Sequence, residues 1–199
     1  MEQPRYTWLR QLLKDVSGVY VEVGTCWGGL ADFLCRETPV NKLLCVDPYR
    51  KFPAEEYQDT LNTESQENLD KKYLAVWSRL HDSFRGKAEI VRTTSTAAAG
   101  CFANNCLSFV YIDGNHAFDH VVEDIVSWIV KVRPGGIIAG DDVEDLALFH
   151  TDGNAKIVHE GGASSLCGVH MALEHIKKSN PWFDYQLEGN QWWWRRPVE

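Results

Sequence analysis

The residues best suited to chemistry are an acid and a histidine that directly follow an apolar stretch. Asp113 and His116 lie three residues apart, after the run from Ser108 to Ile112. A neutral imidazole can take a proton from a substrate hydroxyl, so the two form a candidate catalytic pair. The simpler alternative is that His116 caps the start of the next helix.

A second acidic group, Asp141 and Asp142, follows a short apolar stretch further along the chain. Adjacent carboxylates repel each other and therefore favour a bound cation. Together with Asp113 they form a candidate three-carboxylate site for Mg²⁺ or a similar hard metal ion. The alternative is a solvated acidic loop.

The segment from Val21 to Gly29 has the pattern of a glycine-rich turn between a strand and a helix. Gly24 permits a positive φ and a close approach of a ligand to the backbone of Gly24 and Thr25. Gly28 opens a helix whose free N–H groups favour an anionic group. Glu22 is costly inside a strand unless it meets a cationic partner such as a ligand's amino group. The alternative is an ordinary tight turn.

Asp47 ends the next apolar stretch, 25 residues after Glu22. An acid at this place can accept hydrogen bonds from ribose hydroxyls in a nucleoside-binding doubly wound fold. The alternative is a turn-forming Asp before Pro48. The dinucleotide pattern G-x-G-x-x-G is not met, because position 26 is Cys, and this counts against a nicotinamide dehydrogenase.

Short apolar stretches alternate with helical patterns along the chain, which predicts βαβ units and a mainly parallel sheet. Ligands bind such sheets beyond the carboxyl ends of the strands, where all these polar groups lie. In the helix at 118–132, Val122, Ile125, Val126 and Ile129 are expected to face the core. The stretch 134–136 predicts a turn, and 141–162 a loop. The predicted strands are 19–23, 42–46, 88–92, 108–112, 137–139, 183–187 and 191–195, and the predicted helices are 28–36, 65–84, 96–102, 118–132 and 165–179.

The composition excludes several classes of function. The 199 residues carry a net charge of -8 with a pI near 5.4 and no basic patch, so nucleic acid is not an expected partner. No apolar run reaches the length of a membrane span, and residues 1–10 lack the apolar core of a signal peptide. Six cysteines without paired spacing indicate thiols in a reducing compartment, and we expect a cytoplasmic protein.

Four of these motifs taken together resemble the class I S-adenosylmethionine-dependent methyltransferases. Within that class the chain is similar to the macrocin O-methyltransferase-like group of small-molecule enzymes. The resemblance covers about residues 18 to 142. It rests on the stretches 22–28, 47–48, 111–116 and 133–142.

The resemblance implies a Rossmann-like, doubly wound α/β sheet of seven strands, mostly parallel, with an antiparallel strand in the C-terminal hairpin. It implies that S-adenosylmethionine is the cofactor and assigns its binding residues. These are Glu22, Gly24, Thr25 and Gly28 at the methionine end, Asp47 at the ribose, Thr94 and Ser95 at the adenine, and Asp113. In metal-dependent members, acids at the positions of Asp113, Asp141 and Asp142 hold a divalent ion such as Mg²⁺, and a histidine at the position of His116 is the base.

We therefore expect methyl transfer to a hydroxyl of a small molecule, with or without a divalent metal. The expected organisation is one domain over 1–199, with an N-terminal helix in 1–17 and a lid in 143–163; self-association into a homo-oligomer is compatible with it. Three alternatives stay open: a metal-free N- or carboxyl-methyltransferase, a nucleotide-binding oxidoreductase, and a relative that binds the cofactor without catalysis.

Overall fold

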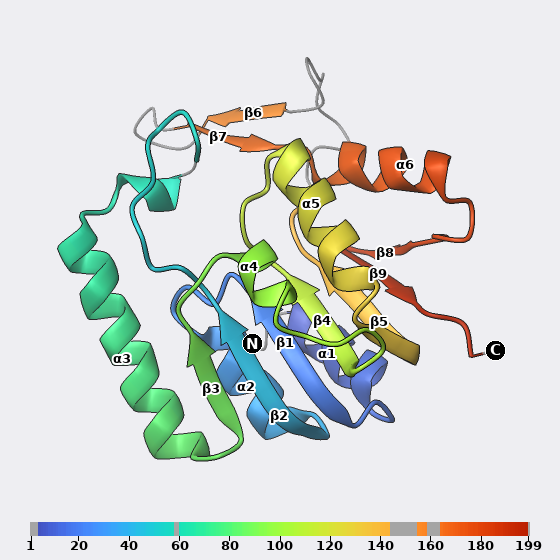
Figure 1. Cartoon of the computed structure of the whole chain (residues 1–199), viewed down its shortest axis with the longest axis horizontal. Coiled ribbons are helices and arrows are strands. Elements are labelled where there is room, and N and C mark those ends of the chain that lie inside the picture. Colours follow the sequence, from blue (N-terminus) through green and yellow to red (C-terminus); the bar gives the residue numbers. More distant parts are fainter. Residues whose placement is uncertain (1–3, 58–59, 144–154, 159–163, 199) are drawn as a thin grey trace.

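The computed structural model describes residues 4–57, 60–143, 155–158 and 164–198. Seven strands form one sheet in the order β3-β2-β1-β4-β5-β9-β8, and β6 and β7 form a separate pair (Figure 1). The first five strands run parallel, and β9 runs antiparallel to both β5 and β8. The expected seven-stranded, doubly wound sheet with an antiparallel C-terminal hairpin is confirmed.

The strands and helices alternate along the chain as the apolar pattern predicts. The strands are β1 Gly18–Val23, β2 Val40–Val46, β3 Ala88–Val91, β4 Leu107–Ile112, β5 Val132–Gly140, β6 Ala155–Val158, β7 Ser164–Cys167, β8 Gln186–Glu188 and β9 Gln191–Arg195. The helices are α1 Pro4–Leu13, α2 Gly29–Glu37, α3 Gln66–Phe84, α4 Ser95–Ala99, α5 Phe118–Ile129 and α6 Val169–Ser179, with a short 3-10 turn at Thr60–Thr63.

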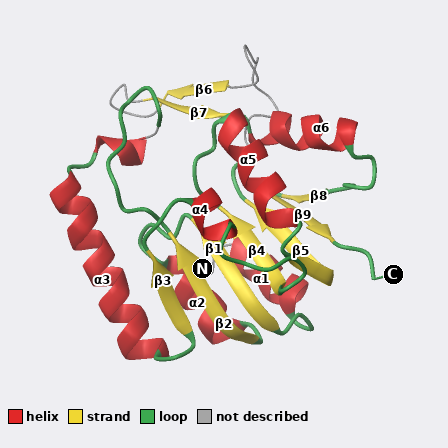
Figure 2. Ribbon diagram, in the orientation of Figure 1, coloured by secondary structure: helices red, strands yellow, loops and turns green. Residues whose placement is uncertain are grey.

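Helices cover both faces of the sheet, and each face has its own hydrophobic core (Figure 2). Side chains of α4, α5 and α6 pack on one face, together with Trp192 and Trp194 of β9. Side chains of α1, α2 and α3 pack on the other face, where Trp193 also lies. The tryptophan run therefore alternates between the two cores, as a strand requires.

Several expected boundaries were wrong. The turn expected at 134–136 lies within β5, where the ladder with β4 shifts register between Leu107 and Phe109 and so accommodates the extra residues. The loop expected at 141–162 contains β6, and the helix expected from 165 begins at Val169, because the preceding residues pair with β6 as β7. The first strand of the C-terminal hairpin has three residues, Gln186–Glu188.

The inner face of α5 also differs from the expectation. The helix buries Val121, Asp124, Ile125 and Trp128, whereas Val126 is 56% exposed. The helix is thus rotated so that an acid, Asp124, lies on its buried side. This rotation has consequences for the site.

Helix α1 lies within residues 1–17, where a helix is expected. Most of the lid expected at 143–163 lies outside the described residues. Within the described part of the chain, no helix is both long and apolar enough to cross a membrane. All six cysteines are free.

Candidate active site

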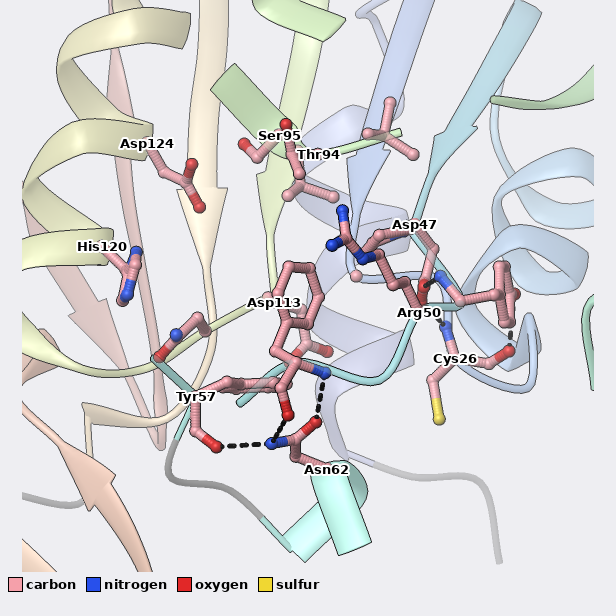
Figure 3. A pocket seen from close by; sticks show the side chains of 18 of the residues that line it. Cys26, Asp47, Arg50, Tyr57, Asn62, Thr94, Ser95, Asp113, His120 and Asp124 are labelled. Atoms are coloured by element: carbon pink, nitrogen blue, oxygen red, sulfur yellow. Dashed lines mark hydrogen bonds between the residues drawn. The ribbon is translucent and has the colours of Figure 1, made fainter. Parts of the chain in front are cut away.

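The carboxyl ends of β1, β2 and β4 meet at a cavity of about 310 Å³. This size is at the lower end of the range for small-molecule sites. The cavity is lined by five residues expected to bind a cofactor: Gly24, Asp47, Thr94, Ser95 and Asp113. The sheet thus brings together side chains that are widely separated in the sequence (Figure 3).

The turn after β1 is packed directly against the turn after β4. Gly24 has φ +86°, and a Cβ at this position would lie 1.7 Å from the carbonyl oxygen of Asp113. The backbone amides of Gly24 and Asp113 donate to the carbonyls of Val46 and Val23, both at 2.8 Å. Position 24 therefore requires glycine for two reasons: its positive φ, and the close contact between the turns after β1 and β4.

Two polar side chains beneath this turn are buried, and neither lines the cavity. Glu22 is 2% exposed and Thr25 3% exposed, and the Glu22 carboxyl interacts with the side chains of Cys45 and Thr25. Burial, followed by the charge of Asp113, raises the pKa of Glu22 to about 8. Both side chains support the turn from below, and their expected role at the methionine end of a cofactor stays a prediction.

Asp47 holds the turn after β2 against the turn after β1. Its two carboxylate oxygens accept from the amide of Cys26 at 2.9 Å and from the amide of Tyr49 at 2.8 Å. Burial raises its pKa, and these two backbone hydrogen bonds oppose the shift. A carboxylate offers about four acceptor positions, so Asp47 keeps capacity for ribose hydroxyls.

The far wall of the cavity comes from the start of α4 and from α5. Ser95 begins α4, and its Oγ accepts from Nε1 of Trp128 at 2.8 Å. Asp124 lies beside it, on the side of the cavity opposite Asp47 (Figure 3). This wall of the cavity is therefore polar, and the buried Trp128 holds the Ser95 hydroxyl in place.

The loop after β2 adds an aromatic rim that sequence patterns did not predict. The rings of Phe52 and Tyr57 are 6.2 Å apart and nearly perpendicular, and both residues line the cavity. The buried Asn62 amide holds this loop: Oδ1 accepts from the amide of Phe52 at 2.9 Å, and Nδ2 donates to the carbonyls of Phe52 and Tyr57 at 3.0 and 2.9 Å.

His116 lies between two carboxylates at the ends of β4 and β5. Its Nε2 is 3.4 Å from Oδ1 of Asp113, and its Nδ1 is 3.2 Å from Oδ2 of Asp142. The expected pairing of Asp113 with His116 is present. Because both ring nitrogens face carboxylates, the protonated imidazole would be stabilised here.

Asp141 does not join this cluster. Its Oδ2 is 2.5 Å from Nη1 of Arg5, and its Oδ1 accepts from Nε2 of Gln191 at 2.8 Å and from the amide of Asp142 at 2.9 Å. The group whose ligand atoms lie within 4.8 Å of one another is Asp113, His116 and Asp142. Nη1 of Arg5 also lies 3.4 Å from Oδ2 of Asp113, so Arg5 bridges Asp113 and Asp141. Among the described residues the structure therefore brings His116, in place of Asp141, beside Asp113 and Asp142, and the three-carboxylate metal site stays a prediction.

Three expected cofactor residues lie off the cavity wall: Glu22 and Thr25 lie beneath the turn, and Gly28 packs on α3. Gly28 has φ +67°, and a Cβ there would lie 3.0 Å from Cγ1 of Val76, so both the left-handed conformation and the packing on α3 favour glycine. Arg5 and Asp124 were not anticipated. An acid on an otherwise apolar helix face was the available signal for Asp124, whereas nothing in the sequence pairs Arg5 with Asp141.

A family model described as a methyltransferase domain matches residues 21–143. The match contains the Gly24 turn, Asp47 and the Asp113–His116 segment. The chain belongs to the class I S-adenosylmethionine-dependent methyltransferases. The acid at Asp47, which lines the cavity, fits the ribose hydroxyls of that cofactor. A comparison of this chain with curated proteins found no match.

Solved structures share its fold at low sequence identity. A protein from Corynebacterium glutamicum aligns with a TM-score of 0.66 and 11% identity, over 100% of this chain and 82% of its own. A putative rRNA-methylase from Clostridium thermocellum aligns at 0.59 and 8%, over 98% and 95%. A 1,6-didemethyltoxoflavin-N1-methyltransferase from Burkholderia thailandensis, with S-adenosylhomocysteine bound, aligns at 0.56 and 13%, over 98% and 77%.

Asp47→Ala is expected to weaken binding of S-adenosylhomocysteine by about 1–3 kcal/mol, the value of hydrogen bonds to a charged group. Isothermal titration calorimetry measures the change, with Asp32→Ala of α2 as the matched control, since Asp32 pairs with Arg36 on that helix. Thermal unfolding is recorded in parallel, because Asp47 also holds two backbone amides. Wild-type affinity in Asp47→Ala would remove the ribose assignment.

Proposed function

We propose that this methyltransferase methylates a hydroxyl group of a small molecule and that His116 accepts the hydroxyl proton. The observation that carries the proposal is the position of the His116 ring between Asp113 and Asp142, at 3.4 and 3.2 Å. A histidine held between two carboxylates gains a proton readily, and general-base catalysis is typically worth about 10²–10⁴ in rate.

The proposed step is a single displacement. The acceptor oxygen forms a bond to the methyl carbon while the bond from that carbon to the sulfonium sulfur breaks, and the sulfur keeps the electron pair. The proton of the hydroxyl goes to His116. The turns that bear Gly24, Asp47 and Asp113 orient the reactants in line, which supplies a large share of the rate.

A small neutral or cationic acceptor fits the charge of the protein better than a polyanion does. The net charge is -8, and the cavity is lined by five acids against two basic residues, Arg50 and Lys72. The acids are Asp47, Glu56, Asp113, Glu123 and Asp124. An acceptor that must lose a proton also accounts for a base at the strand ends, which a carboxylate acceptor would not need. A nitrogen acceptor is the nearest alternative.

A second candidate is metal-assisted transfer, favoured by the clustering of three ligand atoms within 4.8 Å. Asp113, His116 and Asp142 would hold the ion. Two carboxylates and an imidazole suit a transition metal such as Mn²⁺ or Zn²⁺ better than Mg²⁺, which prefers oxygen alone. A bound divalent ion would lower the pKa of an acceptor hydroxyl.

Chelation separates the two candidates, since a ring nitrogen bound to metal has no lone pair for a proton. With His116 as the base, we expect methyl transfer to stay within about two-fold of its starting rate after dialysis against EDTA. A loss of about ten-fold or more that Mn²⁺ or Zn²⁺ restores would establish metal assistance and overturn the role of His116 as base.

The acceptor class is tested by transfer of a labelled methyl group from S-adenosylmethionine to a panel of phenols, sugars, amines and carboxylic acids. Mass spectrometry locates the methyl group in the product. Labelled ethers support the proposal; labelled amines or esters alone would replace it with one of the other acceptor classes.

A further inference from the structure

Asp124 is a buried acid that the proposed chemistry does not use. It is 5% exposed and lies on the inner face of α5 between Val121, Ile125 and Trp128. It also lines the cavity. Burying a carboxyl group among apolar side chains costs free energy, and a role in binding a ligand at the cavity would explain why an acid is present here.

The surroundings of Asp124 leave one part of its carboxylate facing the cavity. The hydroxyl of Ser95 hydrogen-bonds to Asp124, and the Ser95 oxygen in turn accepts from Nε1 of Trp128 at 2.8 Å. Gly114 is a further neighbour, since a Cβ there would lie 3.8 Å from Oδ2 of Asp124, and the charges of His120, Glu123 and His116 also act on the carboxylate. Burial raises the pKa of Asp124 to about 6, and the Ser95 hydrogen bond opposes the shift.

The position of Asp124 in the cavity determines which part of a bound cofactor it can contact. With the ribose at Asp47 and the methionine end near the Gly24 turn, the adenine falls toward Thr94, Ser95 and α5, on the opposite side (Figure 3). The edge of adenine carries a neutral amino group with two N–H donors. Such a group pairs with a carboxylate without adding a second buried charge.

We propose that Asp124 accepts a hydrogen bond from the 6-amino group of the adenine and thereby selects adenosyl over 6-oxo cofactors. The inference rests on S-adenosylmethionine as the methyl donor and is independent of the acceptor, the base and the metal. Ser95, itself held by Trp128, fixes the carboxylate in place, and Gly114, which has no side chain, lines the cavity beside it.

The alternative role for Asp124 is purely structural, as an anchor for Ser95 at the start of α4. An anchor would be indifferent to which group occupies position 6 of the purine. Specificity at that position therefore separates the two roles.

The test compares S-adenosylhomocysteine with S-inosylhomocysteine, in which an oxygen acceptor replaces the amino donor, by isothermal titration calorimetry. Sites built to hydrogen-bond one group reject analogues that lack it, so we expect the wild type to prefer the adenosyl compound by about 100-fold or more. In Asp124→Asn the carboxamide can turn its NH₂ toward the 6-oxo group, and the ratio falls below about ten-fold.

The matched control is Asp119→Asn, which removes the same charge from an exposed position on α5 and keeps the wild-type ratio. An unchanged ratio in Asp124→Asn, or equal weakening of both compounds, overturns the inference. If Asp124→Asn does not fold, the wild-type ratio decides, and a preference under about five-fold overturns it. A wild type that binds neither compound overturns the donor assignment itself.

Discussion

Replacing His116 with asparagine is expected to lower kcat about 100- to 10,000-fold, the usual contribution of a general base. Affinity for S-adenosylhomocysteine is expected to stay within about two-fold, because His116 is not among the residues that line the cavity. Asparagine retains a polar group between Asp113 and Asp142 but cannot accept the proton. Steady-state kinetics and calorimetry on the same preparation measure both quantities.

The matched control is His81→Asn on α3, where the ring also lies beside an aspartate, with Nδ1 3.3 Å from Oδ1 of Asp82. Its kcat should equal that of the wild type. A His116→Asn enzyme with more than about one third of wild-type kcat would show that the proton leaves by another route.

Gly24→Ala is expected to reduce the free energy of unfolding by about 2–6 kcal/mol, a large part of the stability of a typical domain. A left-handed conformation costs a non-glycine residue about 1–3 kcal/mol, and overpacking adds a similar amount. The added Cβ would lie 1.7 Å from the carbonyl oxygen of Asp113 and 2.9 Å from Cα of Gly114. Both are backbone atoms, which cannot move aside as a flexible side chain does.

Gly86→Ala is the matched control. Gly86 has a similar φ of +79°, but a Cβ there would meet nothing within 4 Å. Its loss should be limited to the conformational cost, about 1–2 kcal/mol. Urea denaturation gives both values; equal losses in the two variants would contradict close packing between the turns after β1 and β4.

The strand ends could be predicted because local signals agree there. Gly24, Asp47 and Asp113 each follow an apolar run, and the parallel sheet brings such positions to one edge. These three residues line the cavity, and so do Thr94 and Ser95, which resemblance assigned. The sequence does not show which residues of the turn reach the cavity wall. Glu22 is buried beneath the turn, and Gly28 packs on α3.

The orientation of α5 could not be read from periodicity. Valine or isoleucine occurs at 121, 122, 125, 126 and 129, so two overlapping faces are equally apolar. The contacts with the sheet and α6 decide between them, and they bury Asp124 in place of Val126. Asp124 interrupts the apolar pattern of the buried face of α5 because its side chain lines the cavity.

Arg5 shows a different limit of sequence analysis. Its partner Asp141 lies 136 residues away, and only the docking of α1 brings the two side chains together. Without Arg5, Asp141 and Asp142 are equivalent adjacent acids. With it, Asp141 is held by Arg5 and Gln191, Arg5 also contacts Asp113, and Asp142 lies beside His116.

A crystal structure with S-adenosylhomocysteine tests the central claim most directly, namely that the cofactor lies across the ends of β1, β2 and β4. We expect ligand density in the cavity, with the ribose hydroxyls on Asp47, the adenine at Ser95 and Asp124, and the sulfur facing Asp113 and His116. A ligand bound at another surface, or a reversed ligand with adenine at the Gly24 turn, would contradict it.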